Sequence, residues 1–182
     1  YDRAHGQTVD PKRKREYAFP IANDTLPMKI AALKEMIKTG VDQFDFPPNP
    51  GLLLGGEEKA YFEEMKQIVE VAHASGVVVK AMLEFGYITT PELKAKAAQL
   101  ACEAGIDWVK QSSGWGVGGC PADVEDVKIL KANIELPCRV KVSGKVNTLE
   151  KMKAMFEAGA ELVGTSSGPA IVDGLVGDIN AY

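Results

Sequence analysis

The sequence has few residues of the kind that bind metal ions. It contains two histidines, His5 and His73, and three cysteines, Cys102, Cys120 and Cys138. The spacing of these residues matches no metal motif, and an odd number of cysteines does not suggest a disulfide framework. We therefore expect reduced thiols and no structural metal ion.

Long apolar runs and an excess of basic charge are also absent. The longest apolar runs, such as residues 76–79, are far shorter than the roughly 20 residues that span a bilayer. The N-terminus lacks the apolar stretch of a signal peptide. The formal net charge of −4 provides no basic field for nucleic acid. We expect a cytoplasmic protein with neither membrane nor nucleic acid as a partner.

The composition of the chain is that of an ordinary globular domain. Its 182 residues are 46% hydrophobic and 25% charged, which is enough to build one substantial core. Residues 12–15 form a basic run without hydrophobic periodicity, and such runs are usually solvated. We assign residues 1–16 to an irregular N-terminal segment and residues 17–182 to a single domain.

A strand followed by an amphipathic helix recurs about every thirty residues, which is the length of a βαβ repeat. The helix signals are clear in one example, where Thr90 and Pro91 mark a start and Gly105 marks an end. We predict strands at 17–21, 41–46, 77–83, 106–111, 138–143 and 161–165. We predict helices at 25–39, 57–74, 91–104, 122–132, 148–158 and 169–176.

Six such units fit either an open doubly wound sheet or part of an eight-stranded barrel. The polarity of the strands separates the two folds. In the second strand Phe44 and Phe46 lie on one face, whereas Gln43 and Asp45 lie on the other. A sheet covered by helices on both faces is apolar on both. The alternation therefore predicts an α/β fold of the (β/α)8 TIM-barrel type, with polar residues converging inside it.

Two lysines occupy matching positions near the ends of successive strands. Lys110 and Lys141 each precede a glycine-containing turn. Neighbouring strands lie about 4.8 Å apart, so two inward lysines bring their ammonium groups together and lower a pKa that is ordinarily about 10.4. A neutral amine forms a Schiff base with a carbonyl, and Asp45 on an earlier strand is placed to move protons through water. A single lysine there would be read as solvated.

Glycine-rich turns follow three consecutive strands and are candidates for phosphate binding, because the backbone N–H groups at a helix start attract anions. The last two turns correspond to the loops after the seventh and eighth strands of a barrel, where phosphates frequently bind. The candidate residues are Ser113, Gly114, Gly144, Lys145, Gly164, Ser166 and Ser167.

These residues resemble the motifs of the deoxyribose-phosphate aldolase family. Residues 107–116, DWVKQSSGWG, resemble the family motif D-F-V-K-T-S-T-G-F-G, and residues 140–144, VKVSG, resemble V-K-A-S-G-G. Phe44-Asp45-Phe46 resembles the family's I-D-M, and Lys80 matches an internal lysine. The resemblance implies a cofactor-free (β/α)8 enzyme that cleaves 2-deoxy-D-ribose 5-phosphate to D-glyceraldehyde 3-phosphate and acetaldehyde. It also implies that Lys110 forms the Schiff base, with Lys141 and Asp45 in the proton relay.

The chain departs from these motifs at several positions. Lys145 and Asn147 stand where the family has a glycine and an arginine, Gln111 replaces a threonine, and residues 47–51 replace V-I-N-I-G. Two alternatives therefore stay open. One is a related class I aldolase with a different aldehyde or phosphosugar substrate. The other is a non-catalytic partial barrel that binds a phosphorylated metabolite.

The largest departure is length. Aligned on the motifs, residues 17–21 correspond to the third barrel strand, so the first two βα units are absent. Six strands cannot close an eight-stranded barrel, and the open sheet would leave two edges exposed. We expect an N-terminally incomplete chain, because exposed parallel edges beside a polar interior are energetically costly. Exposed edges would also make a homo-oligomer possible.

Overall fold

A curved sheet of parallel strands forms the centre of the molecule. The computed structural model describes residues 14–17, 23–114, 117 and 119–177. Within these residues, six strands pair in chain order, each with the next. They are β1 (Lys14–Glu16), β2 (Gln43–Phe46), β3 (Val78–Met82), β4 (Trp108–Lys110), β5 (Arg139–Ser143) and β6 (Leu162–Gly164). This arrangement confirms the predicted partial TIM-barrel type of fold.

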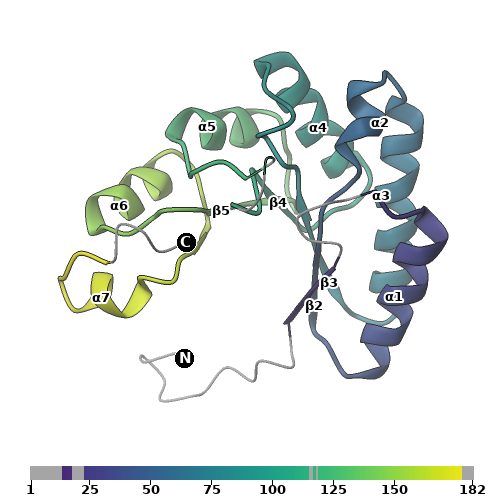
Figure 1. Ribbon diagram of the computed structural model, residues 1–182, viewed down its shortest axis with the longest axis horizontal. Coiled ribbons are helices and arrows are strands. Elements are labelled where there is room, and N and C mark those ends of the chain that lie inside the picture. The colour runs from purple at the N-terminus through teal and green to yellow at the C-terminus, as the bar shows by residue number, and fades with distance from the viewer. Residues whose placement is uncertain (1–13, 18–22, 115–116, 118, 178–182) are drawn as a thin grey trace.

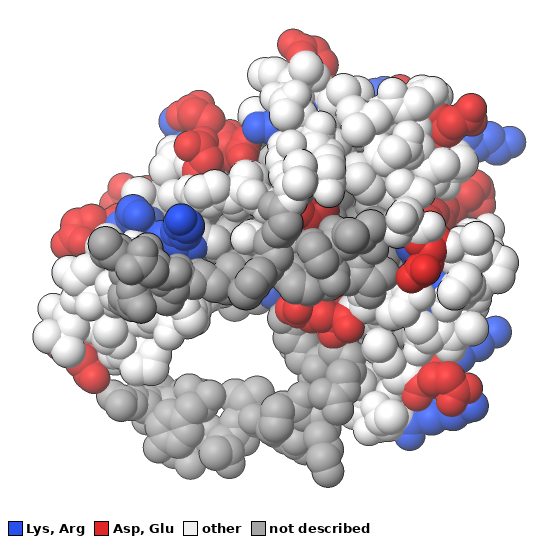
Figure 2. Space-filling model, viewed as in Figure 1, with Lys and Arg blue, Asp and Glu red and all other residues white. Residues whose placement is uncertain are grey.

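The helices form an arc outside the sheet (Figure 1). They are α1 (Leu26–Lys38), α2 (Pro50–Leu54), α3 (Glu58–His73), α4 (Pro91–Glu103), α5 (Val124–Ala132), α6 (Leu149–Glu157) and α7 (Gly168–Val172). Side-chain caps start four of them: Asn49 accepts from Gly51 N, Thr90 from Leu93 N, Asp123 from Glu125 N and Asp126 N, and Thr148 from Lys151 N. Acidic and basic side chains are interspersed over this helical rim on the face shown in Figure 2.

Alternation along the strands separates two faces of the sheet. The register pairs Phe44 with Val79, Ala81 with Val109, and Val109 with Val140 all belong to the buried core. The residues between them point to the opposite face, because successive side chains of a strand alternate. That opposite face carries the polar residues described below, as the alternation in β2 and β5 predicts.

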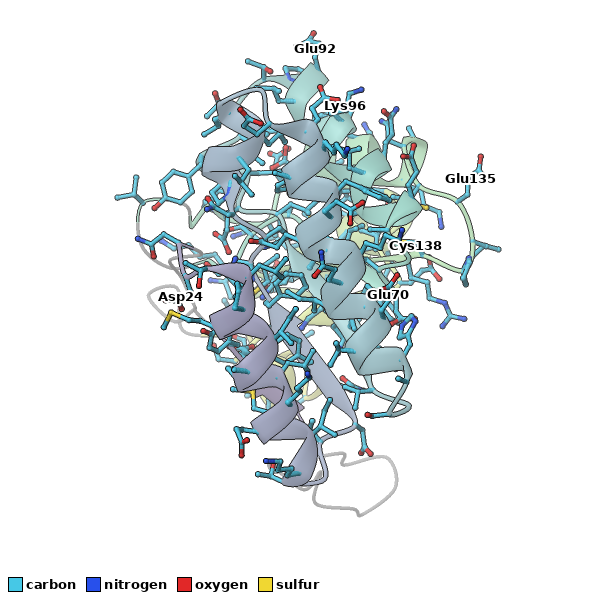
Figure 3. All side chains as sticks on the ribbon, turned by 90° about the vertical axis from the view of Figure 1, so that its right-hand side faces the viewer. Asp24, Glu70, Glu92, Lys96, Glu135 and Cys138 are labelled. Atoms are coloured by element: carbon cyan, nitrogen blue, oxygen red, sulfur yellow. The ribbon has the colours of Figure 1, made fainter. Side chains whose placement is uncertain are left out.

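Helices α1 and α3 lie side by side in Figure 3 and are joined by a buried ion pair. Lys29 Nζ lies 2.8 Å from Glu64 Oε1, and the two side chains are 0% and 5% exposed. The same carboxylate oxygen accepts a hydrogen bond of 2.8 Å from Asn49 N, just before α2. The pair therefore connects two helices and the segment that leaves β2.

The largest differences from the sequence predictions concern three elements. The first strand was predicted at 17–21, but β1 lies at Lys14–Glu16, inside the segment assigned as irregular, and residues 18–22 lie outside the described residues. A charged segment suits this position, because β1 is an edge strand within the described sheet. Helix α2 was not predicted; Asn49 caps it by accepting from Gly51 N, with Pro50 at the first turn. Helix α7 is shorter than predicted and ends before Gly174, which has a φ of 75°.

Among the described residues, none of the helices combines the length and apolar character needed to cross a bilayer.

The buried ion pair predicts a large difference between two lysine substitutions. Lys29→Met leaves the Glu64 carboxylate buried without its cation, so we expect the free energy of unfolding to fall by about 3–5 kcal/mol. Lys38→Met removes an exposed pair with Glu35 and should change it by about 0.5 kcal/mol or less. Urea unfolding measures both. Equal losses of unfolding free energy in the two variants would show that the buried pair contributes no more to stability than the exposed pair.

Candidate active site

Asp45 is the centre of a buried cluster of charges on the inner face of the sheet. Its Oδ1 lies 3.3 Å from Lys80 Nζ on β3, and its Oδ2 lies 3.1 Å from Lys141 Nζ on β5. Lys80 Nζ also donates to Gln43 Oε1 on β2. Asp45, Lys80 and Lys141 are 0%, 2% and 6% exposed. One carboxylate therefore binds two ammonium groups and spans the inner face from β2 to β5.

Lys110 lies next to this cluster. It is the last residue of β4 and is the register partner of Lys141 on β5 and of Met82 on β3. Register partners project from the same face of a sheet, and neighbouring strands are about 4.8 Å apart. Lys110 is buried as well. The sheet register therefore places Lys110 beside Lys141, and Lys141 contacts Asp45.

Gln111, which replaces a threonine of the family motif, joins the ends of β4 and β5. Its Nε2 donates to the carbonyl oxygen of Ser143, and its Oε1 accepts from Ser143 N at 3.4 Å. The side-chain amide thus pairs with both backbone groups of one residue. Because Gln111 follows Lys110 and Ser143 lies two residues after Lys141, this contact connects the strand ends that carry the two lysines.

Glu84 is a functional candidate that the sequence predictions missed. Its backbone follows β3, and its two neighbours pair with the strand of the candidate nucleophile: Leu83 N donates to Lys110 O and Phe85 N to Gln111 O, both at 2.8 Å. Its carboxylate accepts from Ser113 N at 2.8 Å, from Ser113 Oγ at 3.0 Å and, over a longer 3.5 Å, from Ser112 Oγ. The only sequence signal was a charged residue directly after an apolar strand.

Burial raises the pKa of Glu84 to about 7, although the hydrogen bonds from Ser113 and the charge of Lys110 act in the opposite direction. A raised pKa means that the folded chain holds the proton more tightly than the unfolded chain. The contribution of Glu84 to stability is therefore complete below about pH 4.5 and is lost as the pH rises through about 7.

The predicted phosphate-binding residues lie in three turns, which follow β4, β5 and β6. Gly144 and Lys145 both have a positive φ, 106° and 54°, and a Cβ on Gly144 would meet Cys120 O at 3.0 Å. Lys145 is exposed, and Lys151 Nζ donates to its carbonyl oxygen at 3.3 Å. Lysine therefore occupies a left-handed position that favours glycine, the residue the family motif has there.

The turn after β6 lies beside this loop. Thr165 Oγ1 donates to Val146 O at 2.5 Å and accepts from Ser167 N at 3.0 Å. Ser166 is exposed and Ser167 is buried. A Cβ on Gly164 would lie 3.2 Å from Ser143 Cβ and 3.6 Å from Lys141 Cε, so Gly164 packs directly against the charged cluster.

The third predicted turn, after β4, directs its donors inward. Ser113 N and Oγ donate to Glu84, and Gly114 N donates to Ser112 Oγ at 2.9 Å. Phosphate binding by Ser113 and Gly114 stays a prediction, whereas their contacts in the structure hold the turn. Across the described residues, no three or more histidine, cysteine, aspartate or glutamate side chains gather in a way that could hold a metal ion.

Comparison with known proteins agrees with this geometry. The model of the DeoC/LacD family of aldolases matches residues 9–174. The chain belongs to this aldolase family. A deoxyribose-phosphate aldolase of Thermococcus gammatolerans is 38% identical over 166 residues, covering 91% of this chain and 72% of the relative. That of Staphylococcus carnosus is 41% identical over 161 residues, covering 88% of this chain and 70% of the relative.

Solved aldolase structures have the same fold. A structure described as QR15, an aldolase, superposes with a TM-score of 0.79 at 28% identity, covering 88% of this chain and 70% of that one. The deoxyribose phosphate aldolase of Aeropyrum pernix, described as a unique tetramer, superposes with a TM-score of 0.77 at 25% identity. This superposition covers 88% of this chain and 66% of the Aeropyrum pernix chain.

The contact between Gln111 and Ser143 predicts an effect on stability. Gln111→Ala leaves the two backbone groups of Ser143 without these partners, so the free energy of unfolding should fall by about 1–3 kcal/mol. Gln99→Ala is the control, because its hydrogen bond to Asn133 is exposed, and it should change stability by about 0.5 kcal/mol or less. Denaturant unfolding distinguishes the two. A Gln111 variant as stable as the native chain would contradict the role of this contact.

Proposed function

We propose that this member of the aldolase family cleaves 2-deoxy-D-ribose 5-phosphate to D-glyceraldehyde 3-phosphate and acetaldehyde through a Schiff base on Lys110. The observation that supports this most is the buried pair of Lys110 and Lys141 beside an Asp45 carboxylate that binds two ammonium groups. The relatives named as deoxyribose-phosphate aldolases support the substrate.

The cluster supplies what imine chemistry needs. The neutral amine of Lys110 adds to the aldehyde carbon of the substrate, and loss of water from the carbinolamine gives a cationic imine. The positive charges of Lys80 and Lys141 near Lys110 favour its neutral form before attack, because like charges in a buried site repel. No further cofactor is required for these steps.

Cleavage then needs a base and an acid in turn. Removal of the proton from the substrate's 3-hydroxyl breaks the C2–C3 bond, releasing glyceraldehyde 3-phosphate and leaving an enamine on Lys110. Protonation of the enamine and addition of water release acetaldehyde and restore the amine. Asp45, through its contact with Lys141 and through water, is the group that we assign to these proton transfers.

We place the 5-phosphate between the loops that follow β5 and β6. Gly144, Lys145, Gly164, Ser166 and Ser167 lie in these two loops, which are joined where Thr165 Oγ1 donates to Val146 O. The exposed Lys145 adds a positive charge. A phosphate here would lie beside the strand end of Lys141, at the distal end of a substrate whose aldehyde reaches Lys110.

We also propose that the chain self-associates and that it resides in the cytoplasm without a nucleic-acid or membrane partner. Exposed apolar side chains on the last helices and the segment after them, Phe156, Val172, Leu175 and Val176, support an interface with a second copy. The tetramer described for the Aeropyrum pernix aldolase is an assembly of that protein.

The Schiff base predicts a covalent adduct at one lysine. Borohydride reduction of the native chain with acetaldehyde should leave an ethyl group on Lys110, detected by peptide mass spectrometry. Lys110→Arg keeps the positive charge but forms no imine, so it should trap nothing and lose activity. Lys128→Arg is the control, since Lys128 is exposed on α5 and should leave trapping unchanged. A folded native chain that gains no ethyl group on Lys110 would refute the proposal.

The phosphate placement predicts a preference among substrates. The native chain should cleave deoxyribose 5-phosphate with a kcat/KM at least about tenfold above that for deoxyribose, because charge-assisted contacts strengthen binding. Lys145→Met should raise KM for the phosphorylated sugar and leave the unphosphorylated one unaffected. Equal kcat/KM for both sugars would favour a second candidate function, that of an aldolase for another aldehyde. The departures from the family motif at Lys145 and Asn147 are the observation behind that candidate.

A further inference from the structure

The carboxylate of Glu84 accepts hydrogen bonds from Ser112 and Ser113 in the turn directly after Lys110. The side chain of Glu84 is fully buried, and its φ of 54° places a non-glycine residue in the left-handed region. Such a conformation is strained and persists where its surroundings enforce it. Here the enforcing contacts are the two backbone hydrogen bonds to Lys110 and Gln111 on either side of Glu84.

We propose that Glu84 is a positioning residue for Lys110: its carboxylate holds the turn at residues 111–114 and its negative charge tunes the amine that forms the imine. This role rests on the proposed aldolase function and extends it to a residue that does not touch the substrate. The carboxylate would stabilise the cationic imine after attack, while the ammonium groups around Asp45 favour the neutral amine before it.

The donors and acceptors around the Glu84 side chain show why a carboxylate suits this position. Ser112 Oγ accepts from Gly114 N and from Cys120 N, both at 2.9 Å, which engages both of its lone pairs. The hydroxyl proton of Ser112 is left to point at Glu84 Oε2. Ser113 N donates to the other oxygen, Oε1. Both carboxylate oxygens of Glu84 therefore face donors.

A glutamine amide cannot reproduce this pattern. An NH2 group at the Oε1 position would face the N–H of Ser113, which is only a donor. An NH2 group at the Oε2 position could donate to Ser113 Oγ, 3.0 Å away, but it would lose the longer contact from Ser112 Oγ, which already accepts from Gly114 N and Cys120 N. Either orientation of the amide loses a contact that holds the turn after Lys110.

The charges around Glu84 favour an action on Lys110. Among the described residues, the charge of Lys110 on β4 acts on the Glu84 carboxylate, and the ionisable thiol of Cys120, in the segment before α5, also lies near it. Burial raises the pKa of the Cys120 thiol, so this group is neutral when Glu84 ionises. Beyond Cys120, Lys94 and Asp126 neutralise one another in an ion pair of 2.6 Å.

Competitive labelling with acetic anhydride across a pH series tests this directly, because it reports the neutral fraction of Lys110 without any aldolase step. In Glu84→Gln the positive form of Lys110 loses a favourable negative charge. The labelling midpoint of Lys110 should therefore move to lower pH by about one unit. Borohydride trapping with acetaldehyde should at the same time slow by about tenfold or more, because the turn and the imine both lose the carboxylate.

Two further variants separate charge, position and stability. Glu84→Asp keeps the charge but shortens the reach to Ser113, so its labelling midpoint should stay near that of the native chain while trapping slows. Glu64→Gln is the matched control: it removes another buried carboxylate, from the ion pair with Lys29 on the outer helices. It should lower the free energy of unfolding without moving the midpoint of Lys110.

The outcomes are distinct. An unchanged Lys110 midpoint in folded Glu84→Gln, or the same shift in Glu64→Gln, overturns the role of Glu84. If Glu84→Gln does not fold, a native midpoint with native trapping in Glu84→Asp overturns it, and a native midpoint with slowed trapping supports it. A native chain that traps no imine refutes the aldolase proposal itself, whatever the labelling curves show.

Discussion

The burial of several lysines around one carboxylate is the constraint on which the rest of the structure depends. Removing charged groups from water is costly unless each finds a close partner. Asp45 lies on β2 and Lys141 on β5, so their contact requires the intervening strands to be in the right register and curvature. A slip of one residue in any of these strands would turn its lysine toward the helices. The apolar outer face, packed against the helical layer, holds that register in place.

Much of this arrangement is readable from the sequence, because it is periodic. The alternation in β2 and β5 separates the two faces, and the matching positions of Lys110 and Lys141 follow from the repeat. The contacts of Glu84 were not readable, since they depend on one residue in the left-handed conformation at the end of a strand. Helix α2 was missed because five residues carry no period, and β1 because a charged edge strand looks like a solvated run.

The residues just beyond the strands form a second layer of organisation. Gln111, Glu84 and Ser112 lie where the backbone pairing of the strands comes to an end. Each makes side-chain hydrogen bonds to a neighbouring segment instead. These hydrogen bonds hold the strand ends that carry the lysines in place, although the chain turns into a loop directly after them. They also explain how the departure from the family motif at Gln111 is accommodated: a longer side chain makes its contacts to the next strand.

The pairing of Gln111 with Ser143 bears on how the spacing between the ends of β4 and β5 is set. In a regular sheet, the separation of two strands follows from backbone hydrogen bonds and is the same for every sequence. Here the last contact between the ends of β4 and β5 is made by the side-chain amide of Gln111, so the length of this contact depends on one residue. A substitution at Gln111 would therefore alter the spacing of the ends of β4 and β5 without replacing Lys110 or Lys141.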